Sequence, residues 1–359
     1  MKSSVLFAPI TFRSYHASET LPAKFERLLD ASPLAEAVRG KKTAVKMHLG
    51  RSIGYATIHP MFVEILISKL KAYGADVFIT DHIIGNARAR GYTEEYLGCP
   101  IIPCCGDDGS FFYEKSVDFK TFRNVDVAGY IHDADVLIDL SHVKGHGVCG
   151  FGGAVKNISM GCVSDRTRRQ IHSLEGGLNW DSDKCIRCGV CVDNCNHSAL
   201  SFENDRLTMN QHHCTSCQHC VKTCPTGAFQ LDAGRFEDFQ QGMALCTQKC
   251  LEHFAPGAVY YINFLMNITA LCDCWGFTTP DIVPDIGILA SDDIVAIEHA
   301  SLSLIKTENF LPAGVPIGYE LGEKGHLFER IHGKDPYVQL RALEKLGMGS
   351  FDYTMQEIC

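Results

Sequence analysis

Short apolar runs alternate along the first half of the chain with a stretch in which apolar residues recur at helical spacing. The runs are continuous, as in strands of a sheet covered on both faces, and lie at 4–10, 43–49, 75–82 and 133–143. Residues 61–74 have the spacing of an amphipathic helix that ends at Gly74. This alternation predicts an α/β domain with a mainly parallel sheet and flanking helices. The stretch 85–125 is harder to interpret, because turn residues interrupt it.

The same alternation resumes after residue 235. It predicts helices at 236–254, 292–306 and 335–347, and strands at 258–269 and 286–291. Ser291 or Asp292 is the expected N-cap of the second helix, and Pro336 falls in the first turn of the third. The simplest architecture is one α/β domain built from 1–180 and 236–359, interrupted by a small α+β ferredoxin-like domain at 181–235.

Two cysteine runs inside the insert share the spacing C-x2-C-x2-C-x3-C. They comprise Cys185, Cys188, Cys191 and Cys195, and then Cys214, Cys217, Cys220 and Cys224. This is the pattern of bacterial two-cluster ferredoxins, in which the fourth cysteine of each run ligates the other cluster. We therefore expect two [4Fe–4S] clusters, with Cys224 completing the first and Cys195 the second. The alternative is that the clusters only stabilise the fold, but the presence of two adjacent clusters favours a role in electron transfer.

The number and spacing of the cysteines and the net charge limit the classes of protein to which this chain can belong. The 18 cysteines would serve either disulfides in an oxidising compartment or thiolate ligands in a reducing one. Their bunching at short fixed spacings favours metal binding, and the N-terminal residues lack the apolar region of a secretory signal. A formal charge of −9 without any basic run argues against a nucleic-acid partner, and no apolar stretch is long enough to predict a membrane span. We expect a cytoplasmic protein.

A glycine-rich segment follows the strand predicted at 133–143, and it carries most of the candidate chemistry. Glycines there would let the backbone approach a ligand and present N–H groups to an anion. The candidates are Lys144, His146 and Lys156 as catalytic residues, and Gly150, Gly152, Gly153 and Asn157 as cofactor-binding residues. The segment matches neither the Walker nor the dinucleotide fingerprint. The alternative is a flexible connection whose lysines face water.

Side chains at the predicted carboxyl ends of strands form a further candidate set, because open parallel sheets bind ligands beyond those ends. His48, Asp81 and His82 occupy such positions, with His48 counted among the cofactor-binding residues. A single histidine there is more often a surface residue. Asp285 is expected to orient a substrate.

Cys272 and Cys274 flank Asp273 and suggest a third metal centre. On a strand, residues i and i+2 point to the same face, so both thiolates would reach one metal ion. Two buried free cysteines of the core are the alternative. Cys246 and Cys250, one helical turn apart, are interpreted as core residues.

Several long motifs occur in order along the chain: "VKMHLG", "HVKGHGVCGFGGAVKNISMG", the two cysteine runs, "YINFLMNITALCDCWG" and "IVPDIGILASDDIVAIEHASL". Together they resemble the domain of unknown function 362 family, whose members often carry a ferredoxin-type insert. The resemblance covers nearly the whole chain and implies an iron–sulfur protein in an anaerobic or redox setting, without implying a particular reaction. The family's usual acidic residue after "VAI" is Glu298 here, and Ile294 stands where proline is more usual.

These observations support three functional hypotheses. The leading one is an iron–sulfur oxidoreductase, in which the clusters pass electrons to a site in the α/β domain that holds a small anionic substrate or a bound cofactor. The second is a non-catalytic electron carrier that docks a partner redox enzyme. In the third, the clusters sense redox state for an enzyme whose own reaction is not redox. No stretch matches a flavin fingerprint, but flavin stays among the candidate cofactors because flavin sites often lack one.

Overall fold

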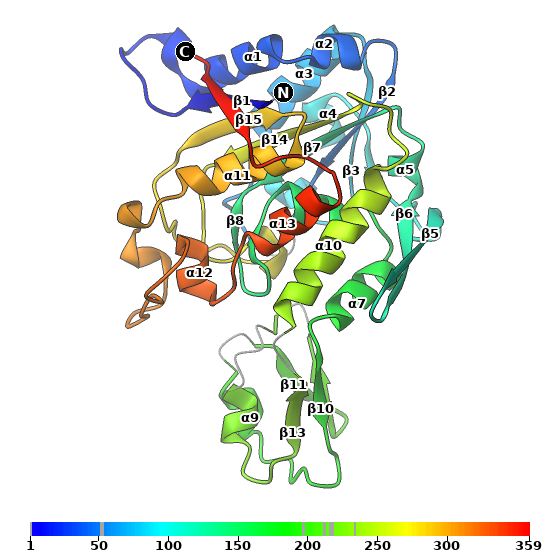
Figure 1. The fold of residues 1–359 in the computed structure, drawn as a ribbon, viewed down its shortest axis with the longest axis vertical. Helices are drawn as coiled ribbons and strands as arrows, with labels where there is room; N and C mark the ends of the chain where they lie inside the picture. Colours follow the sequence, from blue (N-terminus) through cyan, green and yellow to red (C-terminus); the bar gives the residue numbers. More distant parts are fainter. Residues whose placement is uncertain (1, 51–53, 196–197, 211–212, 215–218, 233–234) are drawn as a thin grey trace.

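In the computed structural model, an eight-stranded sheet runs through the larger part of the molecule, and a small cysteine-rich lobe projects from one end (Figure 1). The structure describes residues 2–50, 54–195, 198–210, 213–214, 219–232 and 235–359. The strand order is β16–β1–β15–β14–β7–β2–β3–β4. Five of its seven neighbouring pairs are parallel, so the predicted α/β class with a mainly parallel sheet is confirmed.

The parallel half of the sheet fixes the edge at which a ligand could bind. It consists of β2 (Lys42–Met47), β3 (Asp76–Asp81), β4 (Ile101–Pro103) and β7 (Val136–His142). Helix α3 (Pro60–Ala72) connects β2 to β3 and is followed by Gly74 with a φ of 93°, a left-handed conformation that glycine adopts without strain. Because the four strands run in one direction, the residues that follow them meet at one edge of the sheet.

The other half of the sheet mixes strand directions. It comprises β14 (Val259–Leu265), β15 (Gly287–Ser291), β1 (Ser3–Pro9) and the edge strand β16 (Tyr353–Glu357). β15 runs antiparallel to both of its neighbours, β14 and β1. The strand predicted at 258–269 ends early, because Asn267 adopts a left-handed φ of 46° that breaks the extended backbone.

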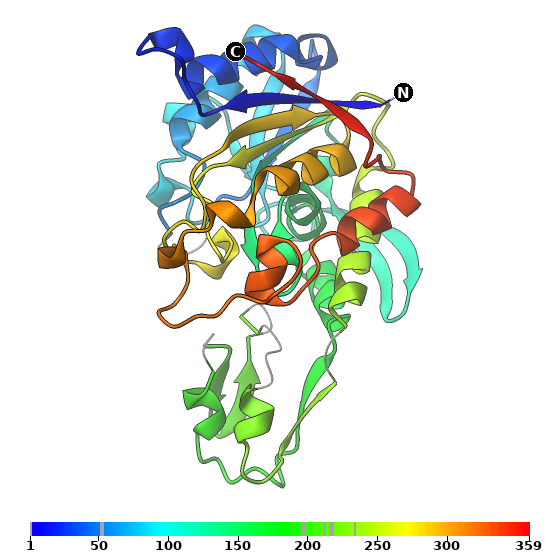
Figure 2. The same ribbon diagram turned by 60° about the vertical axis from the view of Figure 1, so that its left-hand side comes forward.

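Helices cover both faces of the sheet, which explains why its strands are continuously apolar (Figure 2). One face packs against α1 (Leu21–Ala31) and α3, and the other against α6 (Ala154–Gly161) and α11 (Ile294–Leu304). Helices α10 (Phe236–Leu251) and α13 (Val338–Lys345) pack on α6 and α11, respectively, and on each other. Along β7, Leu137 belongs to the core on one face and Ile138 to the core on the other. Both side chains are fully buried.

Two predicted helix starts are corrected by the structure. Helix α11 begins at Ile294, and its N-cap is Asp293, whose carboxylate accepts a hydrogen bond from the Ala296 N–H at 2.9 Å. The same carboxylate also accepts from the Ser350 N–H, so Asp293 ties the helix to the C-terminal segment as Asp292 does not. Helix α13 begins at Val338, which places Pro336 before the helix instead of in its first turn.

The stretch 85–125, which gave no clear pattern, contains most of a β-hairpin. Its strands are β5 (Phe112–Phe119) and β6 (Phe122–Ala128), and β5 is largely exposed, so it lacks the apolar run of a core strand. Helices that were not predicted from the sequence include α1, α2 (Leu34–Ala37), α4 (Glu94–Leu97), α5 (Gly129–His132), α7 (Asp165–Ser173) and α12 (Leu327–His332).

The lobe is entered and left through a two-stranded stem, β10 (Gly177–Trp180) paired antiparallel with β13 (Phe229–Asp232). Beyond it lie a second hairpin, β11 (Leu200–Glu203) with β12 (Arg206–Met209), and the short helices α8 (Val190–Asp193) and α9 (His219–Thr223). A small core of its own joins Cys191, Leu200, Leu207 and Phe229. Over the described residues, no helix combines the length and apolar character that crossing a membrane requires.

Candidate functional site

A cavity of about 80 Å³ lies beyond the carboxyl ends of β2, β3 and β7. Its lining includes three cationic side chains and five histidines: Lys46, Lys156, Arg168, His48, His82, His142, His146 and His172. The carboxylates in the lining are those of Asp81 and Asp273. Ligands of open parallel sheets bind at this edge. The excess of cationic groups over carboxylates favours a small anion.

Lys46 brings a buried positive charge to the cavity. Its side chain is 1% exposed, and its Nζ lies 3.0 Å from Asp81 Oδ1 and 2.6 Å from Asn157 Oδ1. Burial raises the pKa of Asp81, but Lys46 and His48 outweigh burial and hold it well below the ordinary value. Gly161 makes room for the lysine, since a Cβ there would come 2.4 Å from Nζ. Asn157, a predicted cofactor ligand, therefore also positions Lys46.

Two histidines reach the cavity from the strand ends, where the sequence placed them. His48 Nδ1 lies 3.1 Å from Asp81 Oδ2. His82 Nε2 lies 3.0 Å from Asp165 Oδ1 at the start of α7. Each imidazole is thus oriented by a carboxylate, which is how proteins fix the face that a histidine presents to a ligand.

The glycine-rich segment is an antiparallel hairpin followed by a helix, and not an open loop. β8 (Lys144–His146) pairs with β9 (Gly150–Gly152), and α6 starts at Ala154. Gly145 is required here, because a Cβ would lie 2.3 Å from the Ala270 carbonyl oxygen. Gly152 and Gly153 line the cavity, whereas Gly150 is paired with His146 in the hairpin and lies outside the lining.

The N-terminus of α6 is occupied by a carboxylate of the chain itself. Glu298 Oε1 accepts a hydrogen bond from the Ala154 N–H. A Cβ on Gly153 would lie 2.4 Å from that oxygen, so only glycine fits between them. An anion at this amide would therefore compete with Glu298, and binding would depend more on the lysines than on the backbone.

Replacing Glu298 by Gln is expected to stabilise the protein increasingly as pH rises from about 5 to 8. Burial raises the pKa of Glu298 to about 8, whereas the pKa of an unfolded glutamate is near 4.5. Between these values only the folded state holds the proton, so the unfolding free energy of the wild type falls with pH, by about 1.4 kcal/mol per unit of pKa difference. Below pH 4.5 the Glu298 carboxyl of the wild type is protonated in both the folded and the unfolded state. There this residue should contribute no pH dependence to the unfolding free energy of either protein. Melting temperatures from pH 5 to 9 test this, with the exposed Glu308→Gln as control. A constant difference across that range would contradict the raised pKa.

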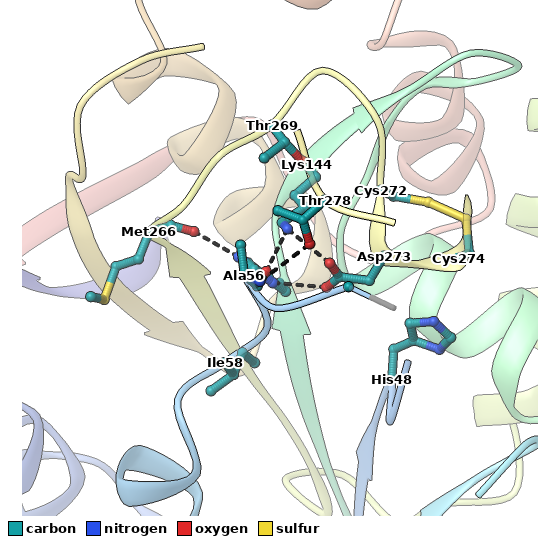
Figure 3. A network of polar contacts seen from close by, with 12 residues as sticks. His48, Ala56, Ile58, Lys144, Met266, Thr269, Cys272, Asp273, Cys274 and Thr278 are labelled. Carbon is teal, nitrogen blue, oxygen red and sulfur yellow. Dashed lines mark hydrogen bonds and ion pairs between the residues drawn. A yellow bond between two sulfur atoms is a disulfide. The ribbon is translucent and has the colours of Figure 1, made fainter. Parts of the chain in front are cut away.

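The Cys-Asp-Cys segment lies on a tight turn that includes the 3-10 helix Asp273–Trp275. The prediction that Cys272 and Cys274 lie on a strand is wrong, because β14 ends at Leu265. Both cysteines nevertheless line the cavity, and their sulfurs are joined as a disulfide (Figure 3). The Lys156 Nζ lies 3.3 Å from Cys274 Sγ and 3.7 Å from Cys272 Sγ. Burial lowers the pKa of this lysine to about 8.

His146 is the third residue of this group. The ligand atoms of His146, Cys272 and Cys274 all lie within 4.8 Å of one another. With both sulfurs reduced to thiolates, this would be a three-ligand set of the kind that holds catalytic zinc with one position open. A disulfide offers no thiolate charge, so the predicted third metal centre applies to the reduced pair only.

Asp273 anchors the turn between the two cysteines. Its Oδ1 lies 2.8 Å from Lys144 Nζ (Figure 3). Its Oδ2 lies 2.9 Å from His142 Nδ1. Burial raises the pKa of Asp273, but the nearby Lys144 and His142 hold it well below the ordinary value. Lys144 also donates to the Ala56 carbonyl oxygen at 2.6 Å. Lys144, predicted to be a catalytic residue, is therefore turned toward Asp273 and does not line the cavity.

Asp285 and the helix α10 cysteines lie away from the cavity lining. Asp285 accepts a hydrogen bond from the Asn267 N–H at 2.6 Å, which stabilises the turn after β14. Cys246 and Cys250 are fully buried in the core, consistent with their interpretation from the sequence.

A pair of thiols at the same edge of the sheet was not predicted as a candidate site. Cys104 and Cys105 follow β4, their sulfurs are 3.8 Å apart, and with His82 their ligand atoms lie within 4.8 Å of one another. The adjacent cysteines were the available signal, but β4 lies in the stretch that gave no clear pattern. Arg168 and His172 on α7 were missed because no strand end points to them.

The lobe presents its cysteines on curled loops. Arg187 and Gly189 have φ values of 55° and 78°, and these left-handed residues bend the chain between Cys185 and Cys191. Such curling lets several thiolates of one short segment converge on one cluster. Cys217 lies outside the described residues.

Backbone amides already point at two of the expected ligand sulfurs. The Ala199 N–H donates to Cys195 Sγ at 3.2 Å, and the Ala228 N–H donates to Cys224 Sγ at 3.3 Å. Hydrogen bonds to sulfur stabilise thiolate charge and tune cluster potentials. The cysteine ligands, and the backbone N–H groups that donate to their sulfurs, therefore fit iron–sulfur clusters.

Fold and site together define an α/β protein with a cation-lined cavity at the carboxyl ends of parallel strands and a cysteine-rich insert. The chain belongs to the family described as "Domain of unknown function (DUF362)", whose family model matches residues 43–303.

The chain is also similar to named iron–sulfur and redox proteins, over part of its length. The formate dehydrogenase iron-sulfur subunit of Haemophilus influenzae is 24% identical over 183 residues, covering 44% of this chain and 57% of that protein. The nitrate-inducible formate dehydrogenase iron-sulfur subunit of Escherichia coli is 31% identical over 96 residues, covering 23% of this chain and 31% of that protein. The match therefore spans less than two thirds of either relative.

One solved structure, the lactate racemase apoprotein of Thermoanaerobacterium thermosaccharolyticum, aligns with 74% of this chain and 51% of its own. Its TM-score is 0.36 and its sequence identity 11%, values too low for a statement about shared activity.

Proposed function

We propose that this chain is an iron–sulfur oxidoreductase. Residues 181–235 would hold two [4Fe–4S] clusters, and the α/β domain would hold a small anionic substrate or a bound cofactor in the cavity. When bound, the clusters supply or accept single electrons. The observation that carries the proposal is the cavity, since it joins a buried lysine, two half-buried cations and a sulfur pair at the ligand-binding edge of the sheet. The iron–sulfur subunits among the relatives support the redox role of the lobe.

The residues of the cavity divide into binding and positioning groups. Lys46, Lys156 and Arg168 would bind the anion, and His146, which also lines the cavity, would exchange a proton with it. Lys144 and Asp285 would act indirectly, because each fixes a turn that borders the site. Gly152 and Gly153 leave the cavity wall without side chains.

A second candidate is a carrier that docks a partner redox enzyme and binds no substrate. The observation in its favour is on the lobe, where Cys188 is exposed and the neighbouring Ile186 is 66% exposed. An exposed apolar side chain beside an expected cluster ligand offers a docking point for a redox partner.

Electron transfer out of the reduced clusters separates the two functions. Protein reduced without oxygen, and freed of reductant, is mixed with sulfite, nitrite, pyruvate or fumarate while the visible absorbance of the clusters is followed. An oxidoreductase should be reoxidised by one class of anion. Lys156→Met should slow that step roughly 10- to 100-fold, the effect of a lost charged hydrogen bond.

The control is Lys306→Met, which removes an exposed lysine outside the cavity lining. Rapid reoxidation by cytochrome c, with no response to any of the anions and no flavin released by acid, would favour the carrier. An unchanged rate in the Lys156 variant would remove that lysine from the site.

A further inference from the structure

We propose that Cys272 and Cys274 form a redox-active disulfide that takes up two electrons from the lobe at the wall of the cavity. The inference rests on the proposed function for the supply of electrons. Beyond that function, the inference names the sulfur pair as the group that receives the electrons, and a contact with the lobe as the route by which they arrive.

The position of the pair suits a reactive disulfide. Both residues line the cavity, so a bound molecule can reach the sulfurs, yet each residue is only 7% exposed. Leu271 and Trp275 pack around them and complete a small apolar cluster. A disulfide so enclosed is shielded from soluble thiols and open to the cavity.

The lobe contacts this segment directly. His213 precedes the expected cluster ligand Cys214, and Trp275 follows Cys274. The two rings are stacked, with centroids 5.1 Å apart and planes 7° from parallel. One ring contact between residues adjacent to the two redox groups therefore joins the lobe to the sulfur pair.

Lys156 supplies the charge that the reduced pair needs. Its Nζ contacts both sulfurs, at 3.3 and 3.7 Å. Two electrons break the sulfur–sulfur bond and leave two thiolates. One thiolate is neutralised by the lysine ammonium, and the other takes one proton from solvent through the cavity.

The reaction is balanced as one disulfide, two electrons and one proton giving one thiolate and one thiol. The electrons would come one at a time from the two clusters that the lobe would hold, and an external one-electron donor protein would supply them to the lobe. The pair would thus convert single electrons into a two-electron reductant beside the bound substrate.

Thiol labelling tests the inference without an activity assay. Protein with oxidised clusters and protein reduced by dithionite are quenched in acid, denatured and treated with N-ethylmaleimide. Mass spectrometry then counts labels on Cys272 and Cys274. We expect none in the oxidised protein and two in the reduced protein. His213→Ala and Cys214→Ala should slow the gain of label, whereas His16→Ala, at an exposed position, should not.

Each other outcome has a distinct meaning. Clusters that bleach on reduction while the pair stays oxidised would overturn the inference and leave the proposed function standing. Chains without reducible clusters would overturn the proposed function itself. Equal labelling rates in wild type, His213→Ala and Cys214→Ala would overturn the route through the lobe. Label in both states, together with a metal ion lost in Cys272→Ser/Cys274→Ser, would replace the disulfide by a metal centre.

Discussion

A variant that lacks both Cys195 and Cys214 is expected to keep one cluster, whereas a variant that lacks both Cys185 and Cys195 is expected to keep none. In crossed ligation, Cys195 and Cys214 serve the same cluster although they belong to different runs. Iron should fall from about eight per chain in the wild type to about four in each single alanine variant and in Cys195/Cys214. In Cys185/Cys195 it should fall close to zero. Iron and acid-labile sulfide of protein purified without oxygen measure both.

The reverse pattern would contradict crossed ligation. If each run held its own cluster, Cys185/Cys195 would keep about four irons and Cys195/Cys214 would keep none. Cys359→Ala serves as control, because this cysteine is exposed and lies outside both runs. Because the comparison is between two double variants with the same number of lost thiols, general instability of the lobe would lower both alike.

The sheet was predictable because its strands are buried on both faces. β2 and β7 carry apolar side chains toward two cores, and such runs are visible without any knowledge of neighbours. The hairpin β5–β6 was not predictable from the sequence, because β5 is exposed and its structure depends on pairing with β6. The strand order and the antiparallel direction of β15 also lay beyond the sequence, because they depend on how helices pack after the strands form.

Site residues were predictable where local position decides their role. His48 and His82 follow buried strands and Asp81 ends one, so strand-end reasoning placed them at the edge where the cavity lies. The partner of Lys144 was not predictable, because Asp273 lies 129 residues further along the chain. The turn that carries Asp273 has no periodic pattern, so its cysteines were assigned to a strand.

Replacing Asp273 by Asn is expected to cost about 3–5 kcal/mol of unfolding free energy, the range found when one partner of a buried ion pair is removed. Lys144 is 1% exposed and Asp273 7%, so neither charge can be screened by water. Asn has nearly the same shape as Asp but no charge, and it leaves the buried ammonium without its counter-charge. Calorimetry of the intact protein should show a melting temperature lowered by several degrees.

The charge of Lys144, and not the shape of the turn, is the expected cause of this loss. The double variant Lys144→Met/Asp273→Asn should therefore recover part of the stability, because it removes both buried charges. Asp281→Asn is the matched control: burial raises the pKa of Asp281, so the folded protein does not favour a negative charge there and loss of that charge should not destabilise it. A double variant as unstable as the sum of the singles would assign the loss to the hydrogen bonds that hold the turn. In that case the pair would anchor the Cys-Asp-Cys segment by geometry alone.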